Sequence, residues 1–171
     1  MNLLIIHSIR FFAILIIQAL ILNQIEIGSG IQLMVYPLFI FLLPVELSII
    51  YLLSISFILG LSIDSICNTY GIHTSALLSF AYLRPIIFKL FIPRDGYDPI
   101  VETNIFTLGF RWFIKCFGTL LFIHHLWFFL VEIFKINELF FVLQKVFLSI
   151  PISFLLCILL QFLFIKKSNE I

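Results

Sequence analysis

The sequence predicts an all-α polytopic membrane protein with six transmembrane helices, of which the second is short or kinked. The composition is the first reason, because 63% of the 171 residues are hydrophobic and 11% are charged. Soluble domains carry about 25% charged residues. The mean hydropathy of +1.22 and long apolar runs separated by Gly, Pro and polar residues agree with this. We therefore expect one integral membrane domain over residues 1–171.

The first apolar run covers residues 3–27 and ends in Asn23, Gln24 and Glu26. A secretory signal has an apolar region of about 7–15 residues followed by a small-residue cleavage site. This run is longer and ends in amides, so we expect an uncleaved first helix.

The second run, residues 31–43, follows a turn at residues 28–30 and is short for a straight crossing. About 20 apolar residues are needed to span a bilayer as a helix. Pro37 lies within the run and Pro44 closes it, and proline kinks or ends helices. A short, broken or re-entrant second helix is predicted.

The third and fourth helices are predicted at residues 47–67 and 73–92. Gly71 lies in the polar turn between them and can adopt the positive φ found at many helix ends. Pro93 ends the fourth helix, and Pro85 within it predicts a kink beside Arg84. Residues 93–104 form the largest hydrophilic loop. Helices at 105–134 and 138–165 and a short polar tail complete the chain.

The distribution of Lys and Arg predicts the orientation, because cytoplasmic loops carry the excess of these residues. With six crossings, two basic residues, Lys135 and Lys145, lie on the outer side, and Arg84 lies within the membrane. Seven lie on the inner side: Arg10, Lys89, Arg94, Arg111, Lys115, Lys166 and Lys167. Both termini are therefore expected in the cytoplasm.

Asp64 and Arg84 are opposite charges within otherwise apolar helices. Ionisable groups at membrane depth are costly and usually pair or serve a function. Arg84 lies about 16 Å along its helix from His73, which starts that helix. Arg84 and Asp64 then lie at different depths in the membrane, and the long Arg side chain can span the difference. We expect the two to interact directly or through one polar group or water, with Gln18 and Gln161 available to the remaining donors. A transport or substrate site is the alternative.

The sequence contains no phosphate-binding loop, nucleophile elbow or zinc-binding helix motif. His124 and His125 are adjacent, so on a helix they point about 100° apart and cannot hold one ligand from the same face. We expect one of them to hydrogen-bond across the helix packing and the other to reach the membrane interface. No enzymatic activity, cofactor or metal is predicted, and a net charge of +1 indicates no nucleic-acid partner.

Several short motifs lie along the helices and loops: G-L-S-I-D (60–64), N-T-Y-G-I-H-T (68–74), A-Y-L-R-P (81–85) and P-R-D-G-Y (93–97), with L-L-P (42–44), F-R-W-F (110–113) and H-H-L (124–126). In their order and spacing they resemble the rod-shape-determining protein MreD family. The resemblance covers essentially the whole chain. It implies a component of the bacterial elongation machinery in the inner membrane, acting in cell shape and peptidoglycan synthesis. It also implies a six-helix fold similar to the S components of energy-coupling-factor transporters.

The family's partners would be the bitopic protein MreC and, indirectly, the MreB filament, RodA and a class B penicillin-binding transpeptidase, with membrane lipid around the helices. The resemblance transfers no catalytic residue. Candidate structural or functional residues are Asp64, Arg84, His73, His124, Gly60, Gly71, Arg94, Asp95 and Tyr97. We expect the loop 93–104 to be a cytoplasmic contact surface, with Arg94, Asp95 and Tyr97 as its contact residues.

Two other functions remain open at this point. A transporter S component would need a polar cavity open to the outside near Asp64, His73 and His124. An intramembrane enzyme would use a histidine.

Overall fold

The computed structural model describes residues 3–25, 27–28, 30–94, 96–98 and 102–165. In these residues the chain is helical apart from turns and extended connections, and one isolated bridge joins Ile27 and Ile31. The elements are α1 (Leu3–Ile16), continuing as η1 (Ile17–Ile21) and η2 (Leu22–Gln24), then α2 (Pro37–Leu42), α3 (Ile49–Cys67), α4 (Ile72–Leu90), α5 (Ile105–Leu108), α6 (Phe110–Ile133), η3 (Ile136–Glu138) and α7 (Leu139–Phe164).

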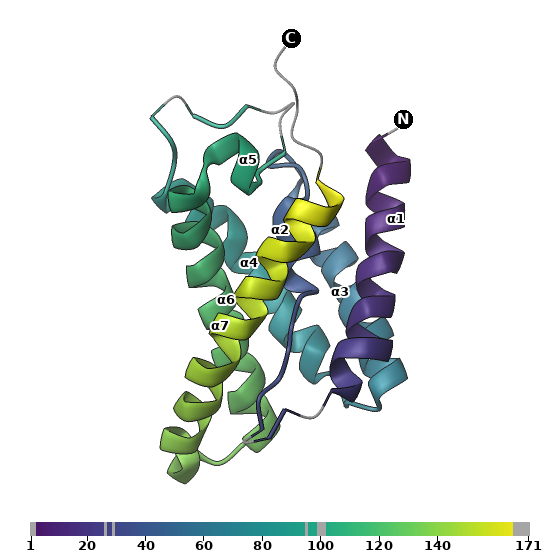
Figure 1. The fold of residues 1–171 in the computed structure, drawn as a ribbon, viewed down its shortest axis with the longest axis vertical. Coiled ribbons are helices and arrows are strands. Elements are labelled where there is room, and N and C mark those ends of the chain that lie inside the picture. The colour runs from purple at the N-terminus through teal and green to yellow at the C-terminus, as the bar shows by residue number, and fades with distance from the viewer. Residues whose placement is uncertain (1–2, 26, 29, 95, 99–101, 166–171) are drawn as a thin grey trace.

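The helices form one bundle in which α1 begins and α7 ends at the same end (Figure 1). Helix α4 packs between α3 and α6, and α7 packs on α6. The short α2 lies inside the bundle, contacts α1, α3, α4 and α6, and has all of its residues buried. The bundle is therefore built around α2.

Four stretches of the described chain are long and apolar enough to cross a membrane: residues 5–24, Ile49–Cys67, Phe110–Ile133 and Leu139–Phe164. The prediction of an all-α protein with membrane-spanning helices is confirmed at this level. Exposed large apolar side chains, such as Ile50 and Phe140, cover the outside of the bundle. Such a surface suits lipid rather than water.

Two predicted helix boundaries are wrong, for local reasons. Residues 31–36 are not helical, and α2 has six residues because it starts at Pro37, which suits the first position of a helix. The helix predicted at 105–134 is broken at Gly109, whose φ of 81° separates α5 from α6. Asn104 starts α5 by accepting hydrogen bonds from Phe106 and Thr107 N–H. The second helix was predicted to be short, broken or re-entrant, and the structure shows it short, with helix only at Pro37–Leu42.

Side chains from neighbouring helices bind the backbone of the non-helical segment before α2. Ser149 and Ser153 of α7 accept from the N–H groups of Gln32 (3.1 Å) and Met34 (3.0 Å). Gln18 accepts from Val35 N–H (2.8 Å) and donates to Leu33 C=O (2.8 Å). Non-helical backbone at membrane depth is tolerated where protein groups or water satisfy it. These bonds replace the helix bonds that the segment lacks.

The ring of Phe41 on α2 lies at the centre of an aromatic cluster. Its centroid is 5.2 Å from that of Phe88, 5.6 Å from Trp112, 5.5 Å from Phe113 and 5.1 Å from Phe117. Offset or edge-to-face aromatic pairs contribute about 0.5–1.5 kcal/mol each beyond burial of their area. Part of the phenylalanine content thus packs α2 against α4 and α6.

Gly60 lets the α3 backbone approach the start of α4. A Cβ on Gly60 would lie 2.5 Å from Thr74 Cα, which no side chain can accept without a shift of backbone. Asp64 lies one helical turn further along the same face of α3. The close contact at Gly60 therefore brings Asp64 to the first turn of α4.

We predict that Gly60→Ala destabilises the protein by about 1–3 kcal/mol, because the added methyl group forces α3 and α4 apart. Gly118→Ala in α6 is the control, since its Cβ would meet only Phe154, at 4.0 Å. The measurement is the free energy of unfolding of both variants in detergent. Equal stability of the two variants would contradict the close approach.

We also predict that Ser153→Ala lowers stability by about 1–3 kcal/mol, the cost of a buried unpaired backbone group. The matched control is Ser62→Ala, because the exposed Ser62 hydroxyl donates only to Ile58 C=O of its own helix. Ser62→Ala should change the free energy of unfolding by no more than about 0.5 kcal/mol. The same unfolding titration tests the pair, and equal losses would show that the bonds to residues 32–34 are unimportant.

Candidate functional site

The carboxylate of Asp64, on α3, binds the N-terminus of α4. Its Oδ1 accepts from Thr69 Oγ1 (2.6 Å) and His73 N–H (3.1 Å), and its Oδ2 accepts from Thr74 N–H (2.8 Å) and the Thr74 hydroxyl. The first N–H groups of a helix lack partners within it and carry partial positive charge. Gly71, with φ of 84°, precedes α4 and has no side chain to cap it. Asp64 supplies this cap from another helix.

The guanidinium of Arg84, on α4, binds the carboxyl end of α2. It donates to Phe41 C=O through Nε (3.3 Å) and Nη2 (3.1 Å), to Leu43 C=O, and to Pro44 C=O (3.5 Å). Its Cζ also lies 4.6 Å from the centre of the Phe88 ring. The last carbonyls of a helix carry partial negative charge. Arg84 therefore caps the carboxyl end of α2, with a positive charge facing the partial negative charge of the last carbonyls.

The predicted direct interaction of Asp64 with Arg84 is wrong. Asp64 binds residues 73 and 74, and Arg84 lies ten residues later on α4, about 15 Å along the helix. Gln18 and Gln161 do not bind Arg84 either, because Gln18 binds residues 33 and 35, and Gln161 Oε1 accepts from Ile105 N–H. Each charge has backbone partners, which the prediction from side chains alone did not consider.

A chain of polar side chains runs from the buried Gln18 through the half-buried Asn23 to the buried His73, and the direction of its hydrogen bonds follows from the backbone. Gln18 Oε1 accepts from Val35 N–H, so Gln18 Nε2 must donate, and it does so to Asn23 Oδ1 (2.6 Å). The Asn23 amide nitrogen then faces Cys67 Sγ (2.9 Å) and His73 Nε2 (3.5 Å). His73 Nε2 is therefore an acceptor, and the ring carries its proton on Nδ1.

His73 Nδ1 lies 3.0 Å from the hydroxyl of Tyr36 and donates to it in this arrangement. The hydroxyl hydrogen of Tyr36 then remains to be donated elsewhere. The ring of His124 packs edge-on against Tyr36, with centroids 5.1 Å apart. The structure thus brings His73 and His124, two of the predicted candidates, against one buried tyrosine.

His124 and His125 are both fully buried. His125 Nδ1 donates to Leu121 C=O (2.9 Å), so its Nε2 accepts from the Ser153 hydroxyl of α7 (3.2 Å). This confirms that one histidine hydrogen-bonds across the helix packing. The expectation that the other reaches the interface is wrong, because His124 is enclosed by Tyr36 and Phe80 and neither ring nitrogen has a hydrogen-bond partner. Its position on the inner face of α6 decides this.

Within the described residues no group of three or more His, Cys, Asp and Glu side chains is placed to hold a metal ion. A surface hollow of about 280 Å³ lies beside Asp64, Asn68 and Gly71. His73 and His124 do not line it, since they are 2% and 0% exposed.

The loop candidates differ in their surroundings. Arg94 is exposed, and Asp95 lies outside the described residues. The Tyr97 hydroxyl donates to Phe88 C=O (2.8 Å), and its ring stacks on that of Phe88. Burial raises the pKa of Tyr97 to about 12, so the hydroxyl stays protonated and can donate at neutral pH. Tyr97 thus ties the loop to the end of α4.

Sequence reasoning missed Tyr36, Ser149, Ser153 and Thr74 as members of these networks. The signal for two of them was present, because Ser149 and Ser153 lie four residues apart on one face of a strongly apolar helix. Tyr36 had no such signal, since its partners come from helices distant in sequence.

Comparison with known proteins adds no relative. No protein-family model, no curated protein and no solved structure matches this chain.

We predict that the effects of Asp64→Asn and Arg84→Gln on stability add. The first removes a helix-end charge worth about 0.5–2 kcal/mol. The second leaves buried carbonyls unpaired, at about 1–3 kcal/mol each. Changes that are far apart and share no partner add within about 0.5 kcal/mol. A double-mutant cycle on unfolding free energies in detergent tests this, and a double variant as stable as either single one would restore the direct pair.

Proposed function

We propose that this protein is a non-enzymatic component of the bacterial cell-elongation complex, of the MreD family, which supports peptidoglycan synthesis and cell shape. It would cross the inner membrane six times with both termini in the cytoplasm, in a fold similar to the transporter S components. The motifs quoted above are the sequence support for this proposal.

One structural observation carries the proposal: residues of the quoted motifs bind the protein's own backbone. Asp64 binds the start of α4, Arg84 binds the end of α2, and Tyr97 binds the end of α4. Gly60 allows the close contact of α3 with α4. Groups used in this way fix a shape and have little left for chemistry. That pattern favours a scaffold over an enzyme.

The surface available for partners consists largely of apolar helix faces. Phe12 of α1, Tyr51 of α3 and Phe162 of α7 are exposed, at 61%, 66% and 61%. Helices associate in membranes through close packing and polar contacts rather than through the hydrophobic effect. We infer that MreC, with its membrane helix, would meet these faces directly, and that MreB, RodA and the transpeptidase would follow through it.

The alternative of a small-molecule-binding transporter subunit finds less support. It requires a polar cavity that includes His73 and His124, and both are buried among aromatic rings. An intramembrane enzyme would likewise need access to these rings.

We expect depletion of the protein in its own bacterium to turn rod-shaped cells into wide or round ones. MreC should co-purify with the tagged protein in mild detergent. Cell width and mass spectrometry of the purified material are the measurements. Unchanged width together with absence of MreC would refute the proposal.

Arg94→Ala and Lys135→Ala form a matched pair within this experiment, because both side chains are exposed and the proposed topology places them on opposite sides of the membrane. Loss of Arg94 should weaken co-purification of cytoplasmic partners, whereas loss of Lys135 should not. The reverse result would overturn the proposed orientation.

A further inference from the structure

The hydrogen bonds that run from the extended segment before α2 to His73 allow one direction only. Val35 N–H and Leu33 C=O fix both ends of the Gln18 amide, because Oε1 accepts from the first and Nε2 donates to the second, each at 2.8 Å. Gln18 Nε2 also donates to Asn23 Oδ1 (2.6 Å), so Asn23 Nδ2 faces His73 Nε2 (3.5 Å). His73 Nε2 therefore has to accept, which the neutral ring can do.

A proton on His73 Nε2 would set two donors against each other at this contact. Turning over the Asn23 amide would relieve it, but Asn23 Nδ2 would then face Gln18 Nε2. Gln18 cannot turn in response, since it would lose its bonds to both backbone groups, and buried backbone groups without partners are costly. The contact between Asn23 and His73 therefore requires a neutral histidine.

Titratable groups of the described residues face His73 from three neighbouring segments. On α3, the carboxylate of Asp64 accepts from His73 N–H (3.1 Å) and attracts a proton toward the ring, and Cys67 Sγ lies 2.9 Å from the same Asn23 nitrogen. The Tyr36 hydroxyl lies 3.0 Å from Nδ1, and the ring of His124 on α6 packs against Tyr36. A histidine beside a carboxylate is suited to take up a proton when the pH falls.

We propose that the contact between Asn23 and His73 is an acid-sensitive joint, which opens when His73 takes up a proton. At neutral pH the joint is closed; on acidification the proton displaces Asn23, and η2 separates from the start of α4. An imidazole in water takes up its proton below about pH 6.5. The half-buried Asn23 is the route by which acid reaches the ring. The hydrogen-bond argument does not depend on the proposed topology or cellular role.

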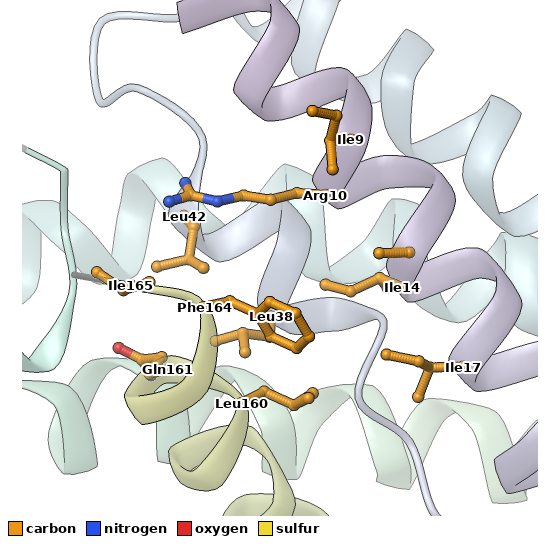
Figure 2. A pocket seen from close by; sticks show the side chains of 11 residues that line it. Ile9, Arg10, Ile14, Ile17, Leu38, Leu42, Leu160, Gln161, Phe164 and Ile165 are labelled. Atoms are coloured by element: carbon orange, nitrogen blue, oxygen red, sulfur yellow. The ribbon is translucent and has the colours of Figure 1, made fainter. Parts of the chain in front are cut away.

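The helix that η2 continues has a lightly packed flank, so it can respond to the opening. Figure 2 shows a hollow between Ile14 and Ile17, of α1 and its extension, and Leu160 and Phe164 of α7. Side chains that line a hollow lack contacts on that side. Helix α4, in contrast, packs between α3 and α6. Opening of the joint therefore frees η2 and the adjoining end of α1, while α3, α4 and α6 stay together.

The Cys67 thiol reports the opening, because Asn23 covers it at 2.9 Å, whereas Cys116 and Cys157 are fully buried. The full chain in detergent is treated with a pyridyl disulfide from about pH 8 to about pH 5, which spans the titration of an imidazole, and the adducts are followed by mass spectrometry. Rates are divided by those of His73→Gln, whose amide accepts from Asn23 but takes up no proton. This ratio cancels the pH dependence of the thiol reaction itself.

The ratio for Cys67 should rise at least about threefold toward acid, because opening linked to one proton changes by up to about tenfold per pH unit. A constant ratio would overturn the proposal. Simultaneous labelling of Cys116 and Cys157 would overturn it too, since that result indicates unfolding of the whole bundle rather than a local joint.

Asn23→Asp is a second variant, because a carboxylate can accept both from Gln18 Nε2 and from protonated His73. It should show no acid-dependent rise in Cys67 labelling relative to His73→Gln. The matched control is Asn68→Asp, which adds the same charge at an exposed position beside Cys67 and should keep the rise. A rise in Asn23→Asp as large as in the unmodified protein would overturn the joint.

Discussion

Backbone amides inside a membrane need hydrogen-bond partners from the protein, and the segment 31–44 meets this need without a long helix. Gln18 and Ser153 bind the amides of its extended part, and Arg84 and Thr103 bind Phe41 C=O at its carboxyl end. These side chains come from α1 and its extension, α7, α4 and the loop before α5. Bonding the broken segment therefore also fixes the positions of the helices around it.

The buried charges follow the same rule. Asp64 faces the partial positive charge of the start of α4, and Arg84 faces the partial negative charge of the end of α2. Each side chain is hydrogen-bonded to backbone groups at a helix end, so neither needs the other as a partner. A charge bound to a helix end also fixes direction, because it distinguishes the N-terminus from the C-terminus. The two bonds thus orient α2 and α4 within the bundle.

The polar interior is used mainly for architecture, which leaves the lipid-facing surface for interactions. His124 and Gln161 are exceptions among the described buried residues, since both ring nitrogens of His124 and the Nε2 of Gln161 have no hydrogen-bond partner. On the outside of the bundle, large apolar side chains of the described helices are exposed. Such a surface suits contacts with molecules beside the protein in the membrane, as the proposed scaffold role requires.

The sequence by itself determined the helical membrane class, the approximate positions of α3, α4, α6 and α7, and the interruption of the second segment at Pro37 and Pro44, because these depend on hydropathy, length and proline chemistry. Only the tertiary structure decided which groups bind Asp64 and Arg84. Their partners are backbone N–H and C=O groups, which nearly every residue carries and no sequence letter distinguishes. Which helix ends come within reach of a charge depends on how the segments pack, and that follows from contacts between residues far apart in the chain.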